Sequence, residues 1–244
     1  WQLDWADFEP KLAEADLFLL CSPHNPLGIV WTPEELRRMV ELCIKHRVVL
    51  FSDEIHSDLI FHGKRHTPTA SVSDEAARYV VTGISGTKTF NLAGMQFSNI
   101  IIPNKEYQEQ WTEVVSNRLS VGMCSPFGLT AIIAAYTEGE EWLDQARAYI
   151  DGNIRYIEEF VKENLPKAVM MDCQGTYLVW LDLNEYCSDS EKLEALMVRK
   201  AGIIFDEGYI FGPEGSGFER INAAAQRSTV EECMKRMKAA LDTL

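Results

Sequence analysis

Short apolar runs alternate with amphipathic stretches through the N-terminal part of the chain. The runs have the length and bulk of buried strands and cover residues 17–20, 48–51, 79–84 and 99–102. A short helix is predicted over Asp7–Ala15. A second is predicted from Thr32 to about His46, because Thr32 can act as N-cap and Pro33 suits the first helical position. Continuous apolar strands that alternate with helices favour a mainly parallel α/β sheet covered on both faces.

The pattern changes towards the C-terminus. A long helix is predicted over residues 140–164, and Pro166 stops it. The other expected helices cover residues 107–119, 126–136, 190–201 and a last segment after Ser228 as N-cap, and the extended pieces cover 168–171, 176–183, 203–205 and 218–222. We therefore predict two domains: residues 1–145 as the C-terminal part of a large domain, and residues 146–244 as a small α+β domain. The helix around residues 140–164 would bridge them.

Charge and composition narrow the function classes. The 244 residues carry a net charge of −14, which argues against nucleic acid and anionic membranes as partners. No apolar run approaches the roughly 20 residues of a membrane span, and the acidic start lacks a signal-peptide pattern. Six cysteines are scattered without a CxxC spacing, so we expect free thiols, a cytoplasmic location and no metal site.

Polar clusters follow three of the predicted strands. They are Ser22–Gly28, Ser52–Asp58 and Ser85–Gly94. In open α/β sheets, ligands bind outside the carboxyl ends of the strands. Three strand ends that each deliver a polar cluster are more specific than any one of them, and they predict a ligand site at this edge.

Each polar residue in these clusters could have a purely structural role or a functional one. Lys88 could be a surface lysine, or an amine that forms a Schiff base with an aldehyde cofactor. Asp53 could cap a helix or pair with an arginine, or it could hold a protonated pyridine nitrogen. Asn25 could serve a turn or donate to a ring hydroxyl oxygen, and Ser85 could cap a loop or bind a phosphate.

Five segments together resemble a known family. They are Ser22–Gly28, Ser52–Asp58, Ser85–Asn91, Thr176–Asp182 and Gly217–Asn222. The chain resembles the class I/II aminotransferases, which are pyridoxal 5′-phosphate enzymes of fold type I. His24 and His56 are most similar to the carbon–sulfur β-lyase branch, the cystathionine β-lyase type. The resemblance covers essentially the whole chain and implies an α/β fold of fold type I with a small α+β C-terminal domain.

The resemblance implies a role for each of five side chains. Lys88 would be the Schiff-base lysine and proton shuttle, Asp53 would hold the pyridine nitrogen, and Asn25 would donate to the ring hydroxyl oxygen. Ser85 would bind the phosphate. Arg220 would clamp the substrate α-carboxylate, because its planar guanidinium suits a two-point bond.

Some positions depart from the family pattern. His56 stands where many aminotransferases carry a tyrosine near the ring hydroxyl, and we include it among the cofactor-binding residues. Gln96 stands where many relatives carry a phosphate-binding arginine, and Ile29 stands where the lyase branch has arginine. The family's N-terminal part, with its phosphate loop and ring-stacking aromatic residue, is absent, so we expect the chain to be a fragment.

The implied activity is β-elimination from cystathionine or cysteine, which gives pyruvate, ammonia and a thiol. An aminotransferase that acts on an amino acid and a 2-oxo acid is the alternative, since the residues around Lys88 do not decide between the two. A non-catalytic protein-binding role is a further alternative, against which the intact Lys88, Asp53 and Arg220 argue. The expected partners are a small amino-acid substrate and a second copy of the chain in a homodimer.

Overall fold

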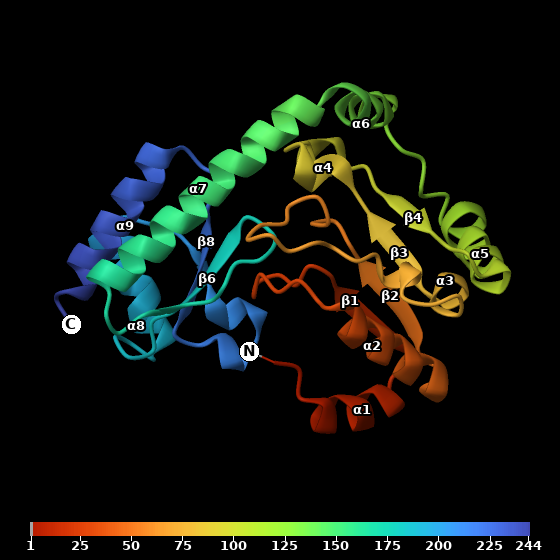
Figure 1. The fold of residues 1–244 in the computed structure, drawn as a ribbon, viewed down its shortest axis with the longest axis horizontal. Coiled ribbons are helices and arrows are strands. Elements are labelled where there is room, and N and C mark those ends of the chain that lie inside the picture. The colour runs from red at the N-terminus through yellow and green to blue at the C-terminus, as the bar shows by residue number, and fades with distance from the viewer. Residues whose placement is uncertain (1) are drawn as a thin grey trace. The chain divides into compact units, whose positions relative to one another are not determined.

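The computed structural model describes residues 2–244, which form two compact units. The first unit runs to His24 and resumes over Val30–Leu143, while the second comprises Asn25–Ile29 and Asp144–Leu244. Figure 1 draws the elements of both. The chain passes from the first unit to the second after Leu143, close to the domain boundary predicted between residues 145 and 146. The domain boundary itself stays a prediction. The assignment of Asn25–Ile29 to the second unit was not predicted.

The first unit is built on a four-stranded sheet. Its strands are β1 (Leu17–Cys21), β2 (Val49–Asp53), β3 (Val81–Ile84) and β4 (Asn99–Ile101), in that spatial order. Strands β1, β2 and β3 are parallel, and β4 runs antiparallel to β3. Cys21 pairs with Asp53, and Asp53 pairs with Gly83, so the parallel strands end at one edge. The prediction of a mainly parallel α/β sheet is confirmed.

Helices cover this sheet and supply much of its core. They are α1 (Trp5–Ala13), α2 (Pro33–His46), α3 (Ala76–Tyr79), α4 (Gly86–Thr89), α5 (Lys105–Trp111) and α6 (Pro126–Glu138). Helix α2 begins after Thr32 as N-cap, as predicted. The structure adds a capping box, in which Glu35 N–H donates to Thr32 Oγ1 at 3.2 Å and Thr32 N–H donates to Glu35 Oε2 at 2.8 Å. Leu36, Met39 and Cys43 of α2 are buried, as is Leu50 of β2.

Three expectations for the first unit were wrong in part. The strand expected over 79–84 begins only at Val81, because residues 76–79 form α3 and the Tyr79 hydroxyl donates a 2.7 Å bond to the Val48 carbonyl. The run 17–20 is a strand that is buried only in part, since Leu20 is 3% exposed but Leu17 and Leu19 are 50% and 67% exposed. The helix expected over 107–119 is α5 followed by a π-helical segment, Thr112–Arg118.

The second unit contains an antiparallel sheet and three helices. The strands are β5 (Val169–Met170), β6 (Leu178–Asp182), β7 (Asp206–Glu207) and β8 (Phe218–Asn222), in the spatial order β5-β6-β8-β7. The helices are α7 (Glu140–Asn164), α8 (Ser190–Ala195), which continues as the π-helical segment Leu196–Ala201, and α9 (Arg227–Leu241). Helix α7 has the bounds that the sequence predicts.

Asn153 joins α7 to the start of α9. Its side chain is fully buried and donates 2.8 Å bonds to the carbonyls of Ala223 and Ala225. It also accepts a 2.7 Å bond from Arg227 Nε. A buried amide with these partners fixes the chain between β8 and α9, because an unpaired polar group there would be costly.

Two boundaries in the second unit differ from expectation. Helix α9 begins at Arg227 with Gln226 as N-cap residue, so Ser228 lies inside the helix rather than at its cap. The extended piece expected over residues 203–205 is not a strand, and β7 begins directly after it at Asp206. Pairing with β8 defines β7, and this pairing is a tertiary contact that the local pattern does not contain.

Candidate active site

Asp53 ends β2 and is half-buried at the edge where the parallel strands end. Burial raises the pKa of its carboxyl, and the nearby Glu54 adds to this effect. The Ile55 N–H, which donates to Asp53 Oδ1 at 3.2 Å, and the positive charge of Lys88 act in the opposite direction. Asp53 and Lys88 are therefore close enough to interact, as the strand-end argument predicts.

Lys88 lies on the short helix α4 rather than on an open loop. Its amine makes no hydrogen bond or ion pair with any residue of the range 2–244. The next residue, Thr89, is buried and donates a 2.8 Å bond to Asp58 Oδ2. The Tyr136 hydroxyl donates to the same oxygen at 3.0 Å. Asp58 thus holds the helix that carries Lys88, and it leaves the amine itself available for chemistry.

Ser85 is the N-cap residue of α4. Its hydroxyl accepts a 3.2 Å bond from Thr87 N–H and donates a 2.5 Å bond to the Phe97 carbonyl. The Thr87 hydroxyl lies 2.6 Å from it. These contacts show that Ser85 caps α4, which is one of its two predicted roles. Its role in phosphate binding stays a prediction.

A buried acidic network next to Asp53 was not singled out from the sequence. Glu54 is 3% exposed, and its Oε1 accepts 2.9 Å bonds from the Ser52 hydroxyl and from Thr69 N–H. His66 Nε2 lies 2.8 Å from Glu54 Oε2. Burial opposes ionisation of Glu54, but these bonds outweigh it and hold its pKa below 4.5. His56, the other predicted residue here, is also buried.

Arg220 of β8 is the centre of a polar cluster in the second unit. Its Nη1 donates a 2.9 Å bond to Asn25 Oδ1, so the structure brings together two predicted residues that are 195 positions apart. Its Nε and Nη2 donate to Asp206 Oδ2 at 3.1 and 2.7 Å. The Phe211 ring centroid lies 4.6 Å from the Arg220 Cζ. No local sequence pattern singles out Asp206, because its contact with Arg220 depends on pairing between β7 and β8.

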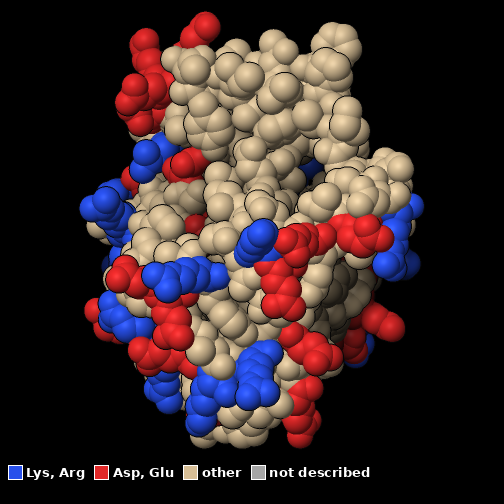
Figure 2. All heavy atoms as spheres, turned by 90° about the vertical axis from the view of Figure 1, so that its right-hand side faces the viewer, with Lys and Arg blue, Asp and Glu red and all other residues tan. Residues whose placement is uncertain are grey.

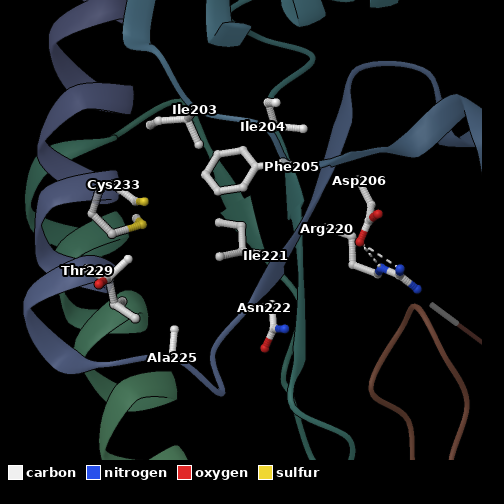
Figure 3. A pocket seen from close by; sticks show the side chains of 12 residues that line it. Ile203, Ile204, Phe205, Asp206, Arg220, Ile221, Asn222, Ala225, Thr229 and Cys233 are labelled. Carbon is white, nitrogen blue, oxygen red and sulfur yellow. Dashed lines mark hydrogen bonds and ion pairs between the residues drawn. The ribbon is translucent and has the colours of Figure 1, made fainter. Parts of the chain in front are cut away.

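A cavity of about 250 Å³ adjoins this cluster. Figure 3 shows apolar side chains on one side of β8 and the Asp206–Arg220 pair pointing away from them. Its lining residues are Ile203, Ile204, Phe205, Asp206, Arg220, Ile221, Asn222, Ala225, Thr229, Val230, Cys233 and Met234. The cavity therefore has an apolar body and a charged rim.

Within the range 2–244, no three His, Cys, Asp or Glu side chains are grouped so that they could hold a metal ion. None of the helices in that range has the length and apolar character required to cross a bilayer.

Comparison with known proteins agrees with the motifs. Cystathionine β-lyase PatB of Bacillus subtilis is 42% identical over 243 residues, which is 99% of this chain and 62% of PatB. The crystal structure of cystalysin from Treponema denticola, which contains pyridoxal 5′-phosphate, is 39% identical with a TM-score of 0.94 and covers 99% of this chain and 62% of cystalysin. A pyridoxal-phosphate-bound C–S lyase from Staphylococcus hominis is 33% identical with a TM-score of 0.89 over 98% of this chain and 62% of that protein.

The two solved structures share the fold of this chain, and the chain spans about three fifths of the length of all three relatives. The predicted fold type I is therefore confirmed. The model of the family "Aminotransferase class I and II" matches residues 1–237 of the 244. The chain therefore belongs to the class I and II aminotransferase family.

Proposed function

We propose that the full-length gene product is a pyridoxal-phosphate-dependent carbon–sulfur β-lyase that releases pyruvate, ammonia and a thiol from cystathionine or cysteine. The observation that carries the proposal is the Lys88 amine, which has no bond to any described residue yet acts electrostatically on the half-buried Asp53. Identity of 42% to a cystathionine β-lyase supports the lyase reading over the aminotransferase alternative.

The residues present fit this cofactor. Burial opposes ionisation of the half-buried Asp53 carboxyl. A cationic ring nitrogen beside Asp53 would stabilise its ionised form. An aldehyde needs an amine that is not already bonded, and Lys88 supplies one. When bound, pyridoxal phosphate supplies an electron sink for the substrate's Cα. His56, Asn25 and Ser85 complete the proposed cofactor-binding set.

Side chains of the protein carry out substrate binding and proton transfer. Arg220 binds the substrate α-carboxylate and so fixes its orientation. The Lys88 amine takes the proton from the substrate Cα. The Cβ–S bond then breaks, the sulfur leaves as a thiolate, and water converts the remaining three-carbon unit to pyruvate and ammonia.

The test uses the full-length gene product and L-cystathionine. We expect pyruvate to appear, and we expect an absorption band at the violet edge of the visible range that Lys88→Ala abolishes. Lys105→Ala is the matched control, because Lys105 is an exposed lysine on α5 that forms an ion pair with Glu109. Amino transfer to a 2-oxo acid without pyruvate would favour the aminotransferase alternative, and the absence of any cofactor band would favour a protein-binding role.

We also infer that the full-length protein is a cytoplasmic homodimer. Helix α6 exposes apolar side chains, including Phe127, which is 81% exposed, and Ile133, which is 55% exposed. Figure 2 shows a largely uncharged area at the top of the view, with a surface of mixed charge below it. Exposed apolar surface of this kind supports an interface between copies. All six cysteines are free thiols, which suits a reducing compartment. Light scattering of the purified protein tests the dimer, and a monomeric mass would contradict it.

A further inference from the structure

The guanidinium of Arg220 is held through three of its five N–H groups. Asp206 Oδ2 accepts bonds from Nε and Nη2 at 3.1 and 2.7 Å, and Asn25 Oδ1 accepts a bond from Nη1 at 2.9 Å. Figure 3 shows the Asp206 and Arg220 side chains meeting beside β8. Among residues 2–244, no acceptor engages the two remaining N–H groups, one on Nη1 and one on Nη2. A carboxylate that accepts from both terminal nitrogens therefore finds one N–H on each.

The strand register explains how Asp206 reaches this position. Asp206 of β7 lies directly opposite Arg220 of β8, and directly opposite residues of antiparallel strands project from the same face of the sheet. Trp180 of β6 lies opposite Arg220 on the other side. The Phe211 ring contacts both, because its centroid lies 4.6 Å from Arg220 Cζ and 5.5 Å from the centroid of the Trp180 ring. Arg220 thus has a carboxylate along one edge and an aromatic ring against its face.

Asp206 has two opposite effects on a carboxylate that binds at Arg220. Its negative charge repels that carboxylate, while its acceptor oxygen fixes a long flexible side chain so that the terminal nitrogens are in place before the ligand arrives. The Asp206 side chain is 47% exposed, so solvent screens its charge. The hydrogen bonds are direct, and the Arg220 side chain that they hold is only 16% exposed. We therefore expect the orienting effect to exceed the repulsion.

We propose that Asp206 is a positioning residue that orients the Arg220 guanidinium for the α-carboxylate of the substrate. The inference rests on the proposed function, since that function assigns the α-carboxylate to Arg220. In this role Asp206 does not touch the substrate and acts only through Arg220, by holding the Nε edge and leaving the terminal nitrogens to the ligand. Every α-amino acid carries this carboxylate, so the role does not depend on the substrate side chain.

The experiment compares two ligands that differ only by the carboxylate. L-alanine has an α-carboxylate, and ethylamine is the same molecule without it. Titration calorimetry on the full-length holoprotein gives the dissociation constant of each, and their ratio measures the preference that the carboxylate provides. The variants are Asp206→Ala, which removes the acceptor, and Asp206→Asn, which keeps an acceptor oxygen without the charge. Glu207→Ala is the matched control, because Glu207 is the next residue of β7 and lies opposite Glu219 rather than Arg220.

We expect Asp206→Ala to reduce the preference for L-alanine over ethylamine about tenfold, through weaker binding of L-alanine alone. Asp206→Asn should keep most of the preference, because its side-chain oxygen still accepts from Arg220, and Glu207→Ala should keep all of it. If Asp206→Ala weakened both ligands equally, the role of Asp206 would be general to the fold, and positioning of Arg220 would be contradicted.

Two further results would overturn the positioning role and leave the lyase proposal standing. One is an unchanged or stronger preference for L-alanine in Asp206→Ala, which would show that repulsion by Asp206 outweighs orientation. The other is a loss in Asp206→Asn as large as that in Asp206→Ala. If the original protein bound L-alanine no more tightly than ethylamine, the carboxylate clamp at Arg220 would be contradicted, and that part of the proposed function would fall with the inference.

Discussion

The Thr89 hydroxyl donates a 2.8 Å hydrogen bond to the carboxylate of Asp58, which lies 31 residues earlier in the chain. The bond connects the loop after β2 to the helix that carries Lys88. Tyr136 donates to the same oxygen, and its pKa is raised to about 12 by burial and then by the Asp58 charge. Asp58 is therefore the shared acceptor that holds α4 in place.

Replacing Asp58 by Ala should loosen α4 without removing any group of the proposed chemistry. Two hydrogen bonds to a charged acceptor would be lost, with a cost of about 2–4 kcal/mol in the free energy of unfolding. We expect the cofactor to bind more weakly, because Lys88 would be less well positioned. Urea unfolding and cofactor titration measure the two effects, and Asp58→Asn, which keeps an acceptor, should recover most of both. Unchanged cofactor affinity in Asp58→Ala would refute the positioning role.

Glu54→Gln should destabilise the first unit most clearly at neutral pH. The native pKa of Glu54 lies below 4.5, so its bonds stabilise the fold above about pH 4.5 and this stabilisation is lost as the pH falls through the native pKa. At neutral pH the variant should lose about 1–3 kcal/mol, because a buried carboxylate with three partners is replaced by an amide.

Urea unfolding as a function of pH checks this expectation. The original protein should lose stability in acid more steeply than Glu54→Gln, so that the difference between them narrows. Asp74→Asn provides a control, because Asp74 is an exposed acid of the same unit. A difference that stayed constant down to acid pH would show that the Glu54 charge is not what stabilises the network.

Glu219→Gln should have the opposite pH dependence. Glu219 is 1% exposed, and its Oε2 has no hydrogen-bond partner among the described residues. Burial, followed by the charges of Glu207, Glu194 and Asp206, raises its pKa to about 8. The unfolded chain releases this proton near pH 4.5 while the folded protein keeps it to about pH 8, so the free energy of unfolding falls between these values.

The amide variant has no proton to lose, so it should be more stable than the original protein in alkali. From the size of the shift, the gain above pH 8 should be on the order of 3–5 kcal/mol, and it should vanish near pH 4.5. Chemical unfolding at several pH values measures it. A gain that did not grow with pH would mean that Glu219 is ionised in the folded protein at little cost.

Gly28→Ala should destabilise the loop that carries Asn25. Gly28 has a φ of +70°, and a Cβ placed there would lie 3.1 Å from the Cys173 Cα. The left-handed conformation alone costs a non-glycine residue about 1–2 kcal/mol, and the close backbone atom adds to it. We expect a lower midpoint of unfolding and weaker L-alanine binding, since Asn25 contacts Arg220. Gly63→Ala is the control, because φ is also +70° there but no atom lies within 4 Å of the added Cβ. The difference between the two variants gives the steric contribution to the loss of stability.

Local signals in the sequence predicted the features that depend on neighbouring residues. The N-cap position of Thr32 and the bounds of α7 were correct, because both depend on contacts within a turn or along one helix. The placement of Asp53 and Lys88 near each other also followed from a general rule, that parallel strands end at a common edge.

The remaining errors and omissions share a tertiary cause. Tyr79 looks like the start of a strand, but it is the last residue of α3, and its hydroxyl donates to the Val48 carbonyl. Asp206 gave no signal, because only the register of β7 against β8 places it opposite Arg220. The exposed side chains of Leu17 and Leu19 show that an apolar run predicts a strand without revealing which of its faces is covered.

Trp180 is a tryptophan whose fluorescence depends on the aromatic cluster of the second unit. Its indole is 3% exposed and stacks on Phe218 with ring centroids 5.2 Å apart and an interplanar angle of 14°. Phe211 is wedged between that indole and the guanidinium of Arg220. A ligand that shifts Arg220 should therefore move the ring next to the indole and change the contribution of Trp180, one of six tryptophans, to the intrinsic emission.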